Sequence, residues 1–494
     1  MYIRNLEIKN LKLIRDLKIN FSRGGEPRMW TVLVGRNGLC KTSILQAIAL
    51  AASGPTRANQ LADPPSMRDR RKPSEVVQWV ASFEFGRLNA GFRAYPDVKP
   101  SEQRPEGLAS YFNVPSHYHI VQGISFYQSK YFDVTVSEGR VFFLDMPLTG
   151  KFEHDQNNLF NPEFVNAMKT LGKNWYYNPL ESARAEGLPH WFVAGYGVSR
   201  SLPFPNDTKS LDDPVRERLE SLFGKGRITG TGFSDLLEKK LALDYSKTLK
   251  EALIGHAGML PGIRDFELRG KGGVRTAKDL IESHLFEMDV GKGKVKVPAT
   301  WLSHGYQATI SWVADLIGQM FWETGKAVKL AEMEGLVLID EIDLHLHPLW
   351  QVGLISTLKA AFPRVQFVAT THSPMMLTGL EADEIIVLDQ DDEGNIKVIE
   401  SNQSPKLMTG SELYGSFFGI DKLYPTEVGE ALQRYGYLAS SPYRSDEEEA
   451  EMNEAIATLK REGVEPGWEP TPRNGKQAKP KASTPKRSKR KKSS

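Results

Sequence analysis

The stretch GRNGLCKTS, Gly35 to Ser43, lies between the apolar run MWTVLV (29–34) and TSILQAIALAAS (42–53), whose apolar residues have helical spacing. A strand, a glycine-rich turn and a helix in this order are typical of a phosphate-binding loop. The backbone amides of such a turn and the positive end of the helix dipole favour a bound anion. The stretch therefore predicts an α/β fold with a site for a nucleoside triphosphate.

Two side chains of this loop have the chemistry that the ligand requires. We expect Lys41 to reach the β- and γ-phosphates and the hydroxyl of Thr42 to ligate Mg²⁺. The residues expected to line the nucleotide are Gly35, Arg36, Asn37, Gly38, Leu39, Cys40, Lys41, Thr42 and Ser43. Cys40 stands where the usual pattern has glycine. Its thiol is either a small residue that the loop tolerates or a site of oxidation or alkylation.

Two further apolar runs each end in polar residues. EGLVLIDEIDLHLHPLWQ (334–351) predicts a strand that ends in Asp340 and Glu341. Strands of an α/β sheet bring such residues to the ligand crevice, where Asp340 would hold Mg²⁺ through water and Glu341 would deprotonate the attacking water. RVQFVATTHSPMML (364–377) predicts a strand followed by His372, whose imidazole would sense the γ-phosphate.

A second anion-binding surface is predicted at the start of another helix. WLSHGYQATISWVADL (301–316) places Ser303, His304 and Gly305 at a helix N-terminus, where free amides favour an anion. This surface is useful only if it meets a γ-phosphate that is held elsewhere. The alternative is an ordinary serine N-cap.

Taken in order, GxNGxxKTS, LSHGYQ, VLIDEIDLHLHP and TTHSP resemble the ABC/SMC-like ATPases. They look most like the AAA-type ATPases once described as predicted ATP-binding proteins involved in virulence. That group includes ATPase subunits of Septu-type and retron-associated anti-phage systems and of overcoming-lysogenization-defect nucleases. The resemblance covers residues 1–55 and 300–390, and FVAGYGVSR (192–200) looks like a strand of the same family.

The resemblance implies ATP and Mg²⁺ as cofactors and a homo-oligomer that is at least a head-to-head dimer. Ser303 and Gly305 would belong to the signature that docks on the ATP of the other subunit, and Asp343 would begin an inter-subunit loop. The implied catalytic residues are Glu341, His372 and Lys41, and the implied metal-binding residues are Thr42 and Asp340. Because Cys40 and His304 depart from the family pattern, we expect a slow, switch-like ATPase.

The expected architecture is an ABC-type P-loop ATPase head of the α/β class with several additions. We expect the N-terminal part of the head over 1–75, an antiparallel β subdomain over 76–150 and a helical lobe over 151–300. The C-terminal part of the head would occupy 301–400, a helical partner-docking region 401–465 and a disordered basic tail 466–494.

The charge of the chain is unevenly distributed. The sequence has 63 lysines and arginines and 61 aspartates and glutamates, but from Arg473 onward it has ten basic residues and no acidic ones. The remainder is therefore acidic, and segment 473–494 is either an arm for nucleic acid or a solubilising end. The single cysteine excludes an internal disulfide, and the sequence has no apolar run long enough for a membrane span, so we expect a cytoplasmic protein.

Three functions remain open. The first is an ATPase that acts as sensor and scaffold and controls a separate effector, a nuclease, in anti-phage defence. The second is a RecF/SMC-like DNA-repair ATPase, which the acidic body disfavours. The third is a transporter subunit, which the long insertions disfavour. The run HLH (345–347) is expected in a loop rather than in a metal site, and LDQDDEGNI (388–396) in a hairpin rather than in a nuclease site.

Overall fold

The structure is a computed structural model, and it describes part of the chain. The described residues are 2–53, 57, 60–62, 67, 69–71, 77–84, 118–121, 124–126, 140–142, 145–147, 192–200, 213–225, 241–255, 258–267, 285–291, 293–401, 403–420, 426–465 and 469–473. They divide into two compact units, residues 1–413 and 414–494, with the boundary inside helix α15.

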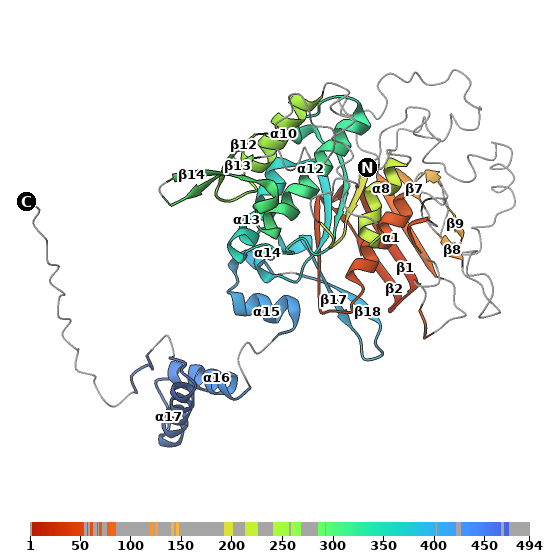
Figure 1. Cartoon of the computed structure of the whole chain (residues 1–494). Helices are drawn as coiled ribbons and strands as arrows, with labels where there is room; N and C mark the ends of the chain where they lie inside the picture. The colour runs from red at the N-terminus through yellow and green to blue at the C-terminus, as the bar shows by residue number, and fades with distance from the viewer. Residues whose placement is uncertain are drawn as a thin grey trace, which may run out of the picture. The chain divides into compact units, whose positions relative to one another are not determined.

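A six-stranded sheet forms the centre of the first unit (Figure 1). Its strand order is β11 (Val193–Tyr196), β15 (Gly335–Ile339), β16 (Val365–Thr370), β5 (Trp30–Val34), β17 (Ile385–Gln390) and β18 (Ile396–Glu400). Neighbouring strands are parallel except β17 and β18, which form an antiparallel hairpin. Every residue of β5, β15 and β16 is buried, as expected for parallel strands covered on both faces. The expected α/β class and the expected hairpin at 388–396 are confirmed.

A second, antiparallel sheet uses the N-terminal hairpin of the chain. It consists of β1 (Tyr2–Leu11), β2 (Ile14–Asn20), β6 (Gln78–Glu84), β7 (Tyr118–Val121), β8 (Ile124–Phe126), β9 (Arg140–Phe142) and β10 (Asp145–Pro147). Buried Gln366 on β16 joins the two sheets, because its side chain accepts from the amide of Ile3 at 2.6 Å and donates to the carbonyl oxygen of Ile3 at 3.0 Å. The expected hairpin over 2–21 is confirmed.

The helices and short elements complete the first unit. The helices are α1 (Lys41–Ser53), α8 (Pro214–Glu220), α10 (Ala242–Ile254), α12 (His304–Thr324), α13 (Pro348–Ala361) and α14 (Pro374–Leu377), and α15 (Gly410–Phe418) contains the boundary between the units. The short strands are β3 (Ser22–Arg23) and β4 (Glu26–Pro27), and the 3₁₀ turns are η3 (Ser221–Phe223), η4 (Ala299–Trp301), η5 (Leu330–Glu332), η6 (Ala382–Glu384) and η7 (Pro405–Leu407). Helix α1 is buried along nearly its whole length, since residues from both sheets belong to the same core.

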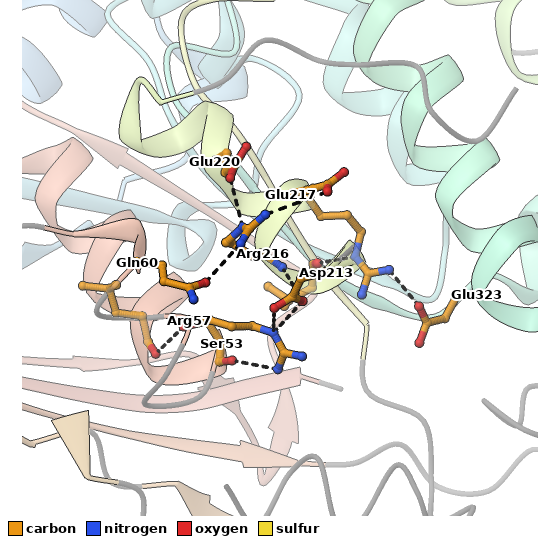
Figure 2. A network of polar contacts seen from close by, with 11 residues as sticks. Ser53, Arg57, Gln60, Asp213, Arg216, Glu217, Glu220 and Glu323 are labelled. Carbon is orange, nitrogen blue, oxygen red and sulfur yellow. Dashed lines mark hydrogen bonds and ion pairs between the residues drawn. The ribbon is translucent and has the colours of Figure 1, made fainter. Parts of the chain in front are cut away.

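Helix α8 is attached to its neighbours by a network of charged residues (Figure 2). Asp213 caps the helix and pairs with Arg57 at 2.6 Å, while Arg216 pairs with Glu220. On the buried side, the guanidinium of Arg218 lies 2.8 Å from the carboxylate of Glu323 on α12, and both side chains are almost fully buried. Helix α8 is therefore fixed both to the segment after α1 and to α12.

The helical lobe expected over 151–300 also contains strands. A three-stranded antiparallel sheet consists of β12 (Ile263–Glu267), β13 (Leu285–Val290) and β14 (Gly293–Pro298). Strand β14 has no fully buried residue. In its sequence GKVKVP the valines alternate with lysines, but neither valine is buried, and pairing with β13 gives this segment its strand conformation. Of the expected lobe, 151–191, 201–212, 226–240, 256–257, 268–284 and 292 lie outside the described residues.

The second unit is a helical hairpin. Helices α16 (Thr426–Ser440) and α17 (Asp446–Arg461) bury Tyr435, Leu438, Met452 and Leu459 among others. Ser445 begins α17 with a capping box in which Glu448 is the reciprocal partner. Of the expected basic tail, 474–494 lies outside the described residues. None of the described helices has both the length and the apolar run that a membrane span requires.

Candidate functional site

The predicted phosphate-binding loop connects β5 to α1, at the carboxyl end of the central sheet. Gly35 has φ of +146° and Gly38 has φ of +86°. A Cβ atom at Gly35 would lie 2.6 Å from the carbonyl oxygen of Leu388 on β17, so a side chain cannot fit there. Glycine at 35 is thus required by the close approach of a neighbouring strand.

Cys40 adopts a backbone conformation that normally favours glycine. Its φ is +57°, in the left-handed region, where an L-residue has a cost of roughly 1–2 kcal/mol. The thiol is partly exposed and lies 3.9 Å from the carbonyl oxygen of Gly38. The departure from the usual pattern therefore strains the backbone at the residue before Lys41.

Lys41 is buried within the loop. Its Nζ donates to the carbonyl oxygen of Gly35 at 2.7 Å and to that of Arg36 at 3.0 Å. Burial lowers the pKa of Lys41, and the carboxylates of Asp340 and Glu341 oppose this shift. The ammonium group is thus held among backbone oxygens at the centre of the loop, where it is available to exchange those partners for phosphate oxygens.

Thr42 and Asp340 meet at the position expected for a metal ion. The hydroxyl of Thr42 donates to Oδ2 of Asp340 at 2.8 Å, and the hydroxyl of Thr370 donates to Oδ1 at 2.7 Å. No cluster of three histidine, cysteine, aspartate or glutamate residues suited to a metal occurs in the described part of the chain, the run 345–347 included. One hydroxyl and one carboxylate fit Mg²⁺, which keeps several waters and takes further ligands from substrate phosphates.

Glu341 and His372 occupy the turns that follow β15 and β16. Glu341 has φ of +47°, and its amide donates to the hydroxyl of Thr370 at 2.7 Å. Asp343 accepts from the hydroxyl of Thr371 at 2.6 Å and so joins the two turns. Burial and the charge of Lys41 lower the pKa of His372, whereas Glu341 and Asp343 raise it. The carboxylates of Asp340, Glu341 and Asp343 therefore act on the pKa of His372 as well as on that of Lys41.

The predicted signature residues lie at the start of α12. Ser303 is the N-cap residue, but its exposed side chain forms no capping hydrogen bond. A Cβ atom at Gly305 would lie 2.5 Å from the carbonyl oxygen of His345, and the rings of His304 and His345 are 5.8 Å apart. The signature thus packs on the loop after β15. No contact joins Ser303 to the phosphate-binding loop among the described residues.

Several residues that support this site were not singled out from the sequence. Arg200, six per cent exposed, donates to the carbonyl oxygens of Asp340 and Glu341. Gln351 on α13 donates to the carbonyl oxygen of Leu346 at 2.8 Å and accepts from Ser373 at 2.6 Å, which joins the loops after β15 and β16. The segment FVAGYGVSR (192–200) contains Arg200 and indicated a strand of the family, but no local pattern in the sequence indicated a role for Gln351.

Comparison with known proteins identifies domains of one type along most of the chain. A family model described as "AAA domain, putative AbiEii toxin, Type IV TA system" matches residues 160–377. A second, described as "AAA ATPase domain", matches residues 1–167. Together they contain the phosphate-binding loop and the turns after β15 and β16.

Individual proteins are similar over much of the chain. "Septu protein PtuA" of Bacillus mycoides is 26% identical over 91% of this chain and 49% of its own length. "Retron Ec83 probable ATPase" of Escherichia coli is 25% identical over 78% of this chain and 71% of its own length. The Smc head domain from Pyrococcus furiosus, solved with the C-terminal domain of ScpA, covers 81% of this chain and 96% of its own at 15% identity and a TM-score of 0.42. The chain thus spans about half the length of the Septu protein that it matches.

Proposed function

We propose that this chain, which belongs to the ATPases with AAA domains, binds ATP with Mg²⁺ and hydrolyses it at sites shared between two copies. The observation that carries the proposal is the meeting of Thr42 and Asp340, 2.8 Å apart, beside the buried Lys41. A hydroxyl, a carboxylate and an ammonium group at the carboxyl end of a parallel sheet are the groups that bind a metal–triphosphate.

Each residue of the site then has one task. Lys41 exchanges its carbonyl partners for the β- and γ-phosphates, and Thr42 and Asp340 hold Mg²⁺, which neutralises charge on the phosphates. Glu341 orients and deprotonates the attacking water. His372 senses the γ-phosphate, and its lowered pKa favours the neutral imidazole near pH 7.

The second copy would supply the signature. The exposed Ser303 has no capping hydrogen bond, so its hydroxyl and the free amides at the start of α12 are available to a γ-phosphate. Since no contact joins Ser303 to the loop of its own chain among the described residues, the phosphate that it meets would be bound to another subunit. ATP would then hold two heads together, and hydrolysis would release them.

We further propose that this cycle controls a separate effector, a nuclease, in anti-phage defence. This role is supported by similarity to proteins named as a Septu protein and a retron ATPase. The helical hairpin α16–α17 is a candidate docking unit, because it is not needed for ATP chemistry. Direct action on DNA has less support: Arg71 of the basic run 67–73 is occupied by Asp69 and by the carbonyl oxygens of Leu13 and Gly394.

Two measurements test this function. The purified chain should hydrolyse ATP in the presence of Mg²⁺, and Lys41→Ala should abolish ATP binding. Affinity purification of the tagged native complex should recover a nuclease in stoichiometric amount. Recovery of a membrane permease would instead favour the transporter alternative. Loss of function together with loss of DNA binding on deletion of 473–494 would favour the DNA-repair alternative.

A further inference from the structure

The turn that carries the proposed catalytic base is held in an unusual backbone conformation. Glu341 has a left-handed φ of +47°, which non-glycine residues adopt only where their surroundings enforce it. Within the described part of the chain, no hydrogen bond or ion pair reaches the Glu341 carboxylate. The direction of this side chain therefore depends on how its backbone is fixed.

Two strands fix this backbone from opposite sides. On the β16 side, the hydroxyl of Thr370 accepts from the amide of Glu341 and donates to the Asp340 carboxylate. On the β11 side, the carbonyl oxygen of Tyr196 accepts from the amide of Asp340 at 2.8 Å. The carbonyl groups of Asp340 and Glu341 both accept from the guanidinium of Arg200, the first at 2.9 Å, and that of Glu341 also accepts from the amide of Leu344 at 2.9 Å.

Arg200 reaches this position because the chain turns sharply inward after β11. Gly197 lets the chain pack closely against η3, since a Cβ atom there would lie 2.2 Å from the carbonyl oxygen of Ser221. The amide of Gly197 donates to the hydroxyl of Ser221 at 3.1 Å. Val198 is exposed, whereas Arg200 is buried two residues later. The fold therefore directs a long cationic side chain beneath the turn after β15.

A buried cation with only carbonyl partners needs compensation from nearby charge. No carboxylate pairs directly with Arg200 among the described residues, but Asp340, Asp343 and Glu341 all attract its charge. Burial lowers the pKa of Arg200 to about 10, so the guanidinium stays protonated at neutral pH. The guanidinium of Arg200 thus donates to backbone carbonyl groups of the turn and also lies close to the carboxylates of the same turn.

We propose that Arg200 is a positioning residue for ATP hydrolysis, which holds the Asp340–Glu341 turn so that the Glu341 carboxylate faces the γ-phosphate. This inference rests on the proposed function. Arg200 acts through the two carbonyl groups and not on the nucleotide, since Lys41 and Thr42 provide the phosphate and metal contacts. Loss of Arg200 should therefore affect the chemical step much more than nucleotide affinity.

The test compares Arg200→Ala and Arg200→Lys with the wild type in kcat, KM and the Kd for Mg-ATP. We expect Arg200→Ala to reduce kcat by about 10²-fold, the typical effect of a misplaced catalytic group, with Kd changed by less than about threefold. Arg200→Lys restores one donor and should give an intermediate kcat. A folded Arg200→Ala variant with the wild-type kcat, or one that loses affinity in proportion to kcat, would overturn the inference.

A matched variant separates positioning from loss of stability. Arg218 is a second buried arginine of the same unit, three per cent exposed, and pairs with Glu323 on α12 at 2.8 Å. Arg218→Ala should lower the melting temperature but leave the kcat of the folded fraction within about threefold of wild type. An equal loss of kcat in both variants would overturn the inference. If Arg200→Ala does not fold, Arg200→Lys replaces it: a lower kcat with an unchanged Kd supports the inference, and an unchanged kcat overturns it.

Glu341→Gln, measured in parallel, distinguishes this inference from the proposed function. If Glu341→Gln is inactive and Arg200→Ala is active, only the role of Arg200 is wrong. If Glu341→Gln hydrolyses ATP at the wild-type rate, the assignment of the base is wrong, and the role of Arg200 falls with it.

Discussion

The hydroxyl of Thr42 lies 2.8 Å from Oδ2 of Asp340, although 298 positions separate the two residues in the sequence. Parallel pairing of β5, β16 and β15 produces this meeting, since it aligns the carboxyl ends of the three strands. The hydroxyl and the carboxylate are also the two protein ligands expected for Mg²⁺. The fold thus brings together, from positions far apart in the sequence, the two side chains that we propose as ligands of Mg²⁺.

Removing the hydroxyl of Thr42 should weaken binding of the metal-bound nucleotide. We expect Thr42→Ala to raise the Kd for Mg-ATP about 10- to 100-fold, since hydrogen bonds and contacts to charged groups contribute roughly 1.5–3 kcal/mol. Binding of ATP in EDTA should hardly change. Thr42→Ser, which keeps the hydroxyl, is the control in a fluorescent-nucleotide titration. An equal loss of affinity with and without Mg²⁺ would mean that Thr42 contacts the nucleotide and not the metal.

Replacing Cys40 by glycine should relieve the strained backbone of the phosphate-binding loop. The left-handed φ of +57° is costly for cysteine, and the added flexibility of glycine offsets part of the gain. We therefore expect Cys40→Gly to bind Mg-ATP more tightly, without a lower melting temperature. Cys40→Ala keeps the Cβ atom and removes the thiol, so it should resemble the wild type. If both variants bind Mg-ATP equally and more tightly than the wild type, the thiol and not the backbone limits affinity; if both bind like the wild type, the strained backbone does not limit affinity.

Asp315 should make the stability of the first unit depend on pH. This carboxyl group on α12 is buried, and burial raises its pKa to about 6, above the unfolded value of about 3.9. Its neutral form is favoured in the folded state, so its contribution to stability is complete below about pH 4 and is lost as the pH rises through 6. Between pH 5 and 7.5 the loss is about 1 kcal/mol.

Urea unfolding of Asp315→Asn at pH 5 and pH 7.5 measures this contribution. The asparagine variant should lack the decline that the wild type shows between these values. Tyr196→Phe is an informative second variant, because the hydroxyl of Tyr196 donates to Oδ2 of Asp315 at 3.0 Å and lowers the pKa of that carboxyl. Tyr196→Phe should therefore steepen the decline. Equal pH dependence in all three proteins would exclude Asp315 as the source.

The sequence predicted the candidate site residues that belong to a recognisable local motif. Gly35 and Asp340 directly follow buried strands and Lys41 begins the helix after the glycine-rich turn, and these changes are visible in the sequence alone. Arg200 was missed because its partners are backbone carbonyl groups about 140 positions away, which leave no mark in the sequence. Gln351 was missed for the same reason, since it joins two loops through main-chain and serine contacts.

Strands without a buried face were missed for a different reason. In GKVKVP of β14 the valines alternate with lysines, but Val295 is exposed and Val297 only partly buried, so pairing with β13 decides the conformation of this segment. The domain boundaries proposed from composition remain predictions. The chain divides at residue 413, whereas the sequence suggested a boundary near 400. Helix α15 contains this division, and a contrast in composition does not reveal a boundary that falls within a continuous helix.

The central claim is that ATP joins two copies of this chain through Lys41 of one and Ser303 of the other. Light scattering on the Glu341→Gln variant, which should bind ATP without hydrolysing it, tests this most directly. We expect the mass to double with Mg-ATP, to remain that of the single chain with Mg-ADP, and to remain so with Mg-ATP when Ser303→Arg is added. A Glu341→Gln protein that binds Mg-ATP yet keeps the mass of one chain would contradict the account.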